Sequence, residues 1–261
     1  MSFSSYIITI MKQLAFILAA AAALCATAAE PVLVGHRGSD IGIESSREAL
    51  EEGARRGYPF LESDIRVAGD GTFVLSHDET TERLGSGLVV AATSADSLLA
   101  DTLRQTRWDI PYEGRMATLA DMLEICKQYG CRPLIELKWA TGINSEDTSG
   151  IPALIDFITE AGMRDKCMIL TSMKPCLEYI REHYPGVELQ LLVQTKVDEN
   201  FDWCVKHNMG IDIHHSAVTP ERVERFHAAG LPVNVWTVNT PEDRARFTEM
   251  GVDYITTDRL R

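Results

Sequence analysis

Short apolar runs alternate with longer amphipathic stretches from Val32 to the end of the chain. The runs are rich in β-branched residues, which is typical of buried strands, and the longer stretches place apolar residues on one helical face. The predicted strands are 32–34, 60–67, 133–137, 167–170, 188–193, 211–213, 233–236 and 254–255. The predicted helices are 45–56, 119–129, 151–161, 175–183, 201–207, 220–229 and 241–250. This alternation predicts an α/β fold, a (β/α)₈ TIM barrel whose last helix is short or missing.

The region 79–117 interrupts the alternation. A short extra strand at 73–75 precedes it, and its glycine turn at 85–87, its small residues and Pro111 indicate a small insertion or lid over the strand ends. Its apolar residues either line a groove or, as we favour, pack the insertion onto the barrel; they are Leu84, Leu88, Val89, Val90, Leu98 and Leu99. The main alternative fold is a doubly wound sheet. That fold normally has a glycine-rich phosphate loop after its first strand, and Gly35-His36-Arg37-Gly38 is not such a loop.

The first residues have the pattern of a secretory signal. Met11-Lys12 precedes an apolar run at 14–24, and Ala26-Thr27-Ala28 supplies the small residues of a cleavage site. The run is too short to span a membrane. We therefore expect a signal peptide at 1–29, a single barrel domain at 30–261 and a secreted or periplasmic protein without stable membrane insertion. A lipoprotein anchor at Cys25 fits less well because bulky Leu24 precedes it.

The charge composition limits the kinds of molecule that the protein is expected to bind. The chain has 25 Lys and Arg against 38 Asp and Glu, a formal charge of −13, and shows no basic cluster. This argues against nucleic acid and anionic membranes and favours a small diffusible substrate. The remaining cysteines are odd in number and lack zinc-site spacing, so buried free thiols are favoured over a Cys126–Cys131 disulfide. Composition gives no indication of the oligomeric state.

Charged, imidazole and aromatic side chains stand at or near the ends of several predicted strands. They are His36 and Arg37 after the first strand, Glu62 and Asp64 on the second, His77 after the short extra strand, Glu136 and Lys138 at the third, and Trp236 on the seventh. In a barrel these ends converge on one site, and strand residues two apart share a face. Taken singly, each residue is more often structural, but the joint arrangement indicates a functional centre. The adjacent pair His214-His215 is expected to be structural, with His214 at the rim.

The residue types predict phosphate ester chemistry. Three converging carboxylates need protons or a cation to offset their repulsion, and hard oxygen ligands favour Ca²⁺ or Mg²⁺ over zinc. Two histidines are suited to accepting and donating protons near neutral pH. Arg37 and Lys138 add two fixed cations that, beside a metal ion, form a cradle for a phosphoryl group.

In sequence order, these segments resemble the glycerophosphodiester phosphodiesterase family, whose TIM barrels are related to phosphatidylinositol-specific phospholipase C. The resemblance covers Val32 to Asp258 and rests on Gly-His-Arg-Gly, a glutamate before the first helix, Glu-x-Asp-Ile, His-Asp, Ile-Glu-Leu-Lys and Val-Trp-Thr-Val-Asn. It implies His36 and His77 as the acid/base pair, Arg37 and Lys138 as phosphate contacts, Trp236 as a pocket wall, and Glu62, Asp64, Glu136 and Glu44 at one divalent cation. Where the family usually has Glu-Asn-Thr, this chain has Glu44-Ser45-Ser46, so the asparagine contacts are missing or rebuilt.

The resemblance implies an exported, metal-dependent enzyme that cleaves glycerophosphodiesters to sn-glycerol 3-phosphate and an alcohol. A related alternative is phospholipase D-like or lysophospholipase D-like activity on acylated lipids, which would need an apolar groove in the insertion. A non-catalytic phosphodiester-binding barrel is less favoured because both histidines and the acidic set are present. A sugar-phosphate isomerase or aldolase barrel is less favoured still. The head group, the choice between Ca²⁺ and Mg²⁺, and the roles of the two histidines stay open at this point.

Overall fold

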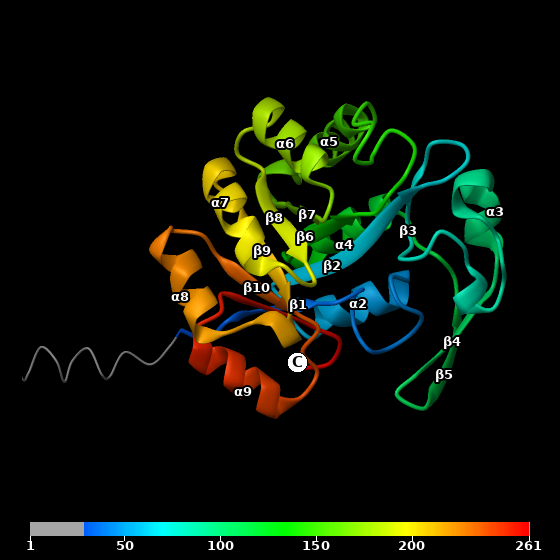
Figure 1. Cartoon of the computed structure of the whole chain (residues 1–261). Coiled ribbons are helices and arrows are strands. Elements are labelled where there is room, and N and C mark those ends of the chain that lie inside the picture. The colour runs from blue at the N-terminus through cyan, green and yellow to red at the C-terminus, as the bar shows by residue number, and fades with distance from the viewer. Residues whose placement is uncertain (1–28, 261) are drawn as a thin grey trace, which may run out of the picture.

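The computed structural model describes residues 29–260, and the predicted signal peptide lies almost wholly outside them. Eight parallel strands pair in the order β1-β11-β10-β9-β8-β7-β6-β2, and β1 also pairs with β2, so the sheet closes into a barrel (Figure 1). The strands are β1 (Val32–Gly35), β2 (Phe60–Val67), β6 (Arg132–Leu137), β7 (Met168–Thr171), β8 (Glu188–Val193), β9 (Gly210–His214), β10 (Val233–Trp236) and β11 (Tyr254–Thr257). The predicted (β/α)₈ barrel is confirmed.

Helices cover the outside of this barrel in Figure 1. They are α2 (Arg47–Arg55), α4 (Leu119–Tyr129), α5 (Ile151–Glu160), α6 (Lys174–His183), α7 (Val197–His207), α8 (Pro220–Ala228) and α9 (Pro241–Met250). The helices at 119–129 and 241–250 have the predicted bounds. The prediction for 201–207 was too short, because α7 begins at Val197, whose buried side chain anchors a first turn that polar residues otherwise dominate.

Part of the barrel interior is apolar. Val34, Phe60, Leu134, Met168 and Leu170 are buried together inside the barrel. Buried Thr256, Asn234 and Gln190 form a hydrogen-bonded chain on the strands β11, β10 and β8. Residues two apart on a strand share a face, so the same interior face carries carboxylates nearer the C-terminal ends of β2 and β6.

The insertion is a small structured unit beside the barrel (Figure 1). Strand β3 (Phe73–Leu75) pairs antiparallel with β2, and a hairpin of β4 (Leu103–Arg107) and β5 (Ile110–Gly114) follows α3 (Ala95–Ala100). The sequence analysis did not predict α3 or the hairpin. The hairpin could not be recognised because its exposed strands show little alternation of apolar and polar residues. Its turn also lacks the usual glycine and places Trp108 and Asp109 at positive φ.

The insertion has its own small apolar core, which accounts for most of its leucines and valines. Leu84, Val90 and Leu98 are buried in it, Leu88 and Leu99 pack against it, and Val89 is 48% exposed. Five of the six residues considered for an acyl-chain groove thus serve packing.

Two further features of residues 29–260 bear on the sequence predictions. Cys126, Cys131, Cys167, Cys176 and Cys204 are all buried free thiols. No helix in this range has both the length and the apolar character needed to cross a membrane.

Candidate active site

Glu62, Asp64 and Glu136 meet inside the C-terminal end of the barrel. Asp64 on β2 is paired directly with Glu136 on β6, and Glu62 lies two residues before Asp64 on the same face. One ligand oxygen from each carboxylate lies within 4.8 Å of the others. Oε1 of Glu62 and Oδ2 of Asp64 are buried and accept no hydrogen bond from any described residue. Orphaned carboxylate oxygens gathered in this way fit the first shell of a hard divalent cation.

Burial and mutual repulsion perturb these carboxyl groups. Burial raises the pKa of Glu62 well above its ordinary range, and the nearby charges of Asp64 and Glu136 add to the rise. Burial likewise raises the pKa of Glu136, to about 7, with a further contribution from Asp64. Burial also opposes ionisation of Asp64, but the cations of Lys138 and Arg37 outweigh it and hold its pKa below the usual range.

Lys138 and Arg37 supply the compensating positive charge. The Lys138 ammonium lies 3.0 Å from Oδ1 of Asp64 and also contacts Glu136. Arg37 donates its backbone N–H to Oε2 of Glu62 at 2.9 Å, and its Nε lies 3.4 Å from Oδ2 of Asp64. Arg37 has a left-handed backbone, φ 49°, which turns the chain so that its amide and its guanidinium both face the carboxylates. The predicted phosphate-binding cations therefore border the predicted cation site.

Each predicted acid/base histidine is held by a carboxylate. Nδ1 of His36 lies 2.9 Å from Oδ1 of Asp258, and Nδ1 of His77 lies 2.7 Å from Oδ1 of Asp78. A carboxylate accepts the Nδ1–H and leaves Nε2 available for a substrate proton. Burial lowers the pKa of His77, and the repulsion from Arg37 acts in the same direction against the attraction of Asp64.

Glu44 lies beside this centre but contacts guanidinium groups. Its carboxylate accepts from Nη1 of Arg37 at 2.9 Å, from both terminal nitrogens of Arg83 at 2.5 and 3.0 Å, and from Gln105 at 2.6 Å. Burial raises its pKa, but Arg83 and Arg37 outweigh this and lower it to about 2. The structure thus places Glu44 next to the three grouped carboxylates without bringing it into that group.

The segment that departs from the family pattern keeps its local structure. The Ser46 hydroxyl accepts from the backbone N–H of Ala49 and caps α2. Ser45 has a left-handed backbone, φ 57°, and its hydroxyl accepts a 2.7 Å hydrogen bond from the Ser63 hydroxyl. Ser45 and Ser63 therefore support each other.

Trp236 ends β10, opposite His214 on β9. The two rings meet edge to face with centroids 4.9 Å apart. His214 therefore lies at the strand ends, where the rim was predicted, and Trp236 remains a predicted wall.

Several residues beside the centre were not singled out from the sequence. Arg83 of the insertion contacts Glu44 and Asp78, and Arg107 of β4 lies 3.1 Å from Asp258. Asp212 on β9 is buried inside the barrel, and burial, with the charge of Glu136, raises its pKa. The sequence could have indicated Asp212 as a site residue, because it interrupts the apolar run Ile211–Ile213. It could also have indicated Asp258, which follows a strand end. The two arginines carry no such signal, because only the fold shows which residues of the insertion reach the centre.

A hollow of about 340 Å³ opens beside His36. It is lined by His36, Arg37, Glu44, Arg107, Trp108 and Asp258. Its walls are polar and charged, apart from the indole of Trp108. Together with the three carboxylates, this is a site equipped to hold a phosphate and to move protons next to it.

Comparison with known proteins identifies the family. The sequence model of the glycerophosphoryl diester phosphodiesterase family matches residues 36–261. The chain belongs to this family. It is therefore an enzyme, a phosphodiesterase, and the resemblance seen in the motifs is confirmed.

Relatives span nearly the whole chain. A glycerophosphodiester phosphodiesterase of Caldanaerobacter subterraneus is 25% identical and covers 87% of this chain and 93% of its own. The human glycerophosphodiester phosphodiesterase 1 is 25% identical over 85% of this chain and 76% of its own. An Oleispira antarctica phosphodiesterase, solved in complex with its product sn-glycerol-3-phosphate, is 21% identical with a TM-score of 0.76 and covers 87% and 93% of the two chains. The Oleispira antarctica structure shares the fold of this chain.

Proposed function

We propose that this enzyme hydrolyses glycerophosphodiesters to sn-glycerol 3-phosphate and an alcohol, and that it needs one divalent cation, Ca²⁺ or Mg²⁺. The observation that carries the proposal is the pair of buried oxygens of Glu62 and Asp64 that accept no hydrogen bond from the described residues, among three grouped carboxylates. The family match and the product bound in the Oleispira antarctica enzyme support the substrate class.

Glu62, Asp64 and Glu136 would hold the cation. Bound there, it would supply positive charge next to the phosphoryl oxygens. Arg37 and Lys138 border the same carboxylates, so their cations bind and orient the phosphate and offset the charge that builds on its oxygens during cleavage.

His36 and His77 are proposed as the acid/base pair. Asp258 and Asp78 hold the two rings through Nδ1 and so direct each Nε2 toward the centre. One histidine takes the proton of the attacking hydroxyl, and the other protonates the leaving alcohol. The attacking hydroxyl is that of water or of the glycerol itself, and an assay for a cyclic phosphate intermediate decides between them.

The phospholipase alternative is less favoured by the insertion. Of the six apolar residues considered for a groove, all but Val89 pack in the apolar core that the insertion shares with Ile43, Ala68 and Val74, or against it. Residues 1–29, with the sequence pattern of a signal peptide, support the further proposal that the enzyme acts outside the cytoplasm, where deacylated lipids are available for scavenging.

The test is release of choline by protein that begins at Glu30. Cleavage of glycerophosphocholine leaves glycerol 3-phosphate, and cleavage of lysophosphatidylcholine leaves an acylated glycerol 3-phosphate. Reactions run with chelator, with Ca²⁺ or Mg²⁺ restored, and with the variants His36→Ala and His77→Ala. We expect release from the deacylated compound only, its loss under chelator, and a fall of roughly 10²- to 10⁴-fold in each variant. Cleavage of the acylated lipid alone, or full activity without metal, contradicts the proposal.

A further inference from the structure

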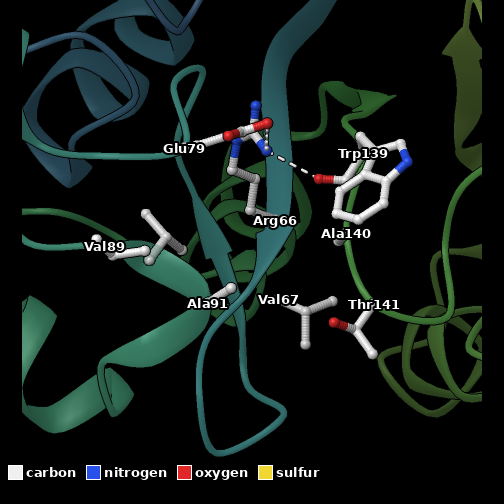
Figure 2. A pocket seen from close by; sticks show the side chains of 9 residues that line it. Arg66, Val67, Glu79, Val89, Ala91, Trp139, Ala140 and Thr141 are labelled. Carbon is white, nitrogen blue, oxygen red and sulfur yellow. Dashed lines mark hydrogen bonds and ion pairs between the residues drawn. The ribbon is translucent and has the colours of Figure 1, made fainter.

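A second pocket lies on the other side of the centre, next to His77. It has a volume of about 100 Å³ and is lined by Arg66, Val67, Glu79, Val89, Val90, Ala91, Trp139, Ala140 and Thr141. Figure 2 shows the Trp139 indole on one side, Val89 and Ala91 on the opposite side, and Arg66 with Glu79 at one end. We refer to it as the Trp139 pocket.

The Trp139 pocket adjoins the catalytic centre through the chain. Arg66 comes two residues after Asp64, Glu79 two residues after His77, and Trp139 directly after Lys138. Arg66 also ties these segments together, because it donates to the carbonyl of His77 at 2.9 Å and to that of Trp139 at 2.8 Å. The pocket thus borders the backbone of His77 and of Trp139, and we infer that one substituent of a phosphodiester held at His77 and Lys138 extends toward it.

The two pockets beside the centre differ in chemistry. The hollow next to His36 is lined by charged side chains, including Arg37, Arg107 and Asp258, which suit the hydroxyl groups of glycerol. The Trp139 pocket is walled mainly by methyl groups and by an indole that is 60% exposed. A diester with one polyol and one less polar substituent fits this asymmetry in one orientation.

The indole and the size of the pocket favour a compact cation. Glu79 is 72% exposed and brings a carboxylate to the rim, 3.9 Å from Arg66, so these two charges largely offset each other. The Arg66 guanidinium is also turned to two carbonyl groups. A cavity of about 150 Å³ holds benzene, so the 100 Å³ here suits a group of about four heavy atoms and excludes an acyl chain.

We propose that the Trp139 pocket is the head-group subsite and that it prefers a quaternary ammonium, as in the choline of glycerophosphocholine. The trimethylammonium group would lie against the indole face, where its charge meets the ring quadrupole and its methyl groups meet Val89 and Ala91. Of the six apolar residues considered for a groove in the insertion, Val89 is the one that is largely exposed. Contact with the head group accounts for its exposure. The proposal rests on the proposed phosphodiesterase function.

The test compares kcat/KM for glycerophosphocholine with that for glycerophosphoglycerol, whose head group is an uncharged polyol. The variant Trp139→Leu keeps an apolar side chain but removes the aromatic face, and Trp139→Phe keeps a ring. We expect Trp139→Leu to lower the ratio of kcat/KM for glycerophosphocholine to kcat/KM for glycerophosphoglycerol by roughly 3- to 10-fold. Trp139→Phe should keep most of the wild-type ratio. Thermal unfolding of each variant verifies that it is folded.

A second pair of variants, one of them a control, tests the role of the Glu79 carboxylate. Glu79→Gln removes the charge at the rim and should lower the same ratio by about 2- to 5-fold at low salt. Glu82→Gln removes an equally exposed charge of the insertion outside the pocket and should leave the ratio unchanged.

The outcomes separate the two proposals. If wild type cleaves both substrates and Trp139→Leu leaves the ratio unchanged, the head-group assignment is wrong and the phosphodiesterase function stands. A preference for glycerophosphoserine, whose head group carries a carboxylate beside its ammonium, also overturns the assignment and points to Arg66. If no glycerophosphodiester is cleaved with either metal, the proposed function fails, and the assignment fails with it.

Discussion

Neutralising Glu44 should destabilise the protein in a pH-dependent way. In Glu44→Gln the side chain keeps its shape but loses the charge that binds Arg37 and Arg83. Its new amide group also faces donors, because Gln105 donates to the same carboxylate in the wild type. The variant therefore leaves two guanidinium groups short of an acceptor in a largely buried position.

The magnitude follows from the pKa of the carboxyl group. Burial raises this pKa, but Arg83 and Arg37 lower it from 4.5 to about 2. At about 1.4 kcal/mol per pH unit this difference corresponds to about 3 kcal/mol of stability at neutral pH. Since the Arg83 side chain is 44% exposed, solvent screens part of the attraction, and we expect about 2 kcal/mol. For a domain of this size that is a fall in Tm of roughly 4–8 °C.

The pH dependence distinguishes a charge effect from a packing effect. A carboxyl group with a depressed folded-state pKa stabilises the protein above its unfolded-state pKa, and this stabilisation disappears as the pH falls through the folded-state value. The difference in unfolding free energy between wild type and Glu44→Gln should therefore be full above pH 5 and shrink between about pH 4.5 and 2. Urea unfolding of metal-free protein at several pH values measures it, with Glu249→Gln on the exposed face of α9 as control.

Two results would refute this reasoning. Equal stability of Glu44→Gln and wild type at pH 7 would mean that the ion pairs contribute nothing. A difference that persists unchanged at pH 3 would mean that the charge is not its source. The same variant tests whether Glu44 supports the cation site, because a roughly tenfold or larger rise in the Kd for Ca²⁺ or Mg²⁺ would show that this carboxylate acts on the cation directly or through Arg37.

Three further predictions concern the centre itself. Asp258→Asn should lower kcat/KM by roughly 10- to 100-fold with little change in KM, because His36 loses the acceptor that fixes its ring; an unchanged kcat would show that the ring is held otherwise. In an NMR titration of metal-free protein, the pKa of His77 should lie below 6.5 because of burial, and Asp78→Asn should lower it further by removing a carboxylate that favours the imidazolium; a rise would contradict the structure. Ca²⁺ or Mg²⁺ at 100 times its Kd should raise the unfolding free energy of the wild type by about 2.7 kcal/mol and raise its Tm accordingly, and this gain should vanish in Asp64→Asn.

The barrel and the position of its centre followed from local pattern. The order of apolar residues predicts buried strands and amphipathic helices. These alternate along the chain, which is the pattern of parallel β/α units. The convergence of His36, Glu62, Asp64 and Glu136 then follows because parallel strands end at the same edge. Period-two alternation further placed Glu62 and Asp64 on one face.

The partners of these residues depended on the tertiary structure. His36 meets Asp258 across 222 residues of sequence, and Glu44 meets Arg83 and Gln105 of the insertion across 39 and 61 residues. No periodic pattern encodes such contacts, because the first depends on the closure of the barrel between β1 and β11 and the others on how the insertion docks onto the barrel. The same docking placed Val89 opposite Trp139 and so formed the second pocket. The sequence by itself thus determined the architecture and the chemical groups of the centre, whereas the charge balance around each group and the shape of the pockets were decided by segments that only folding brings together.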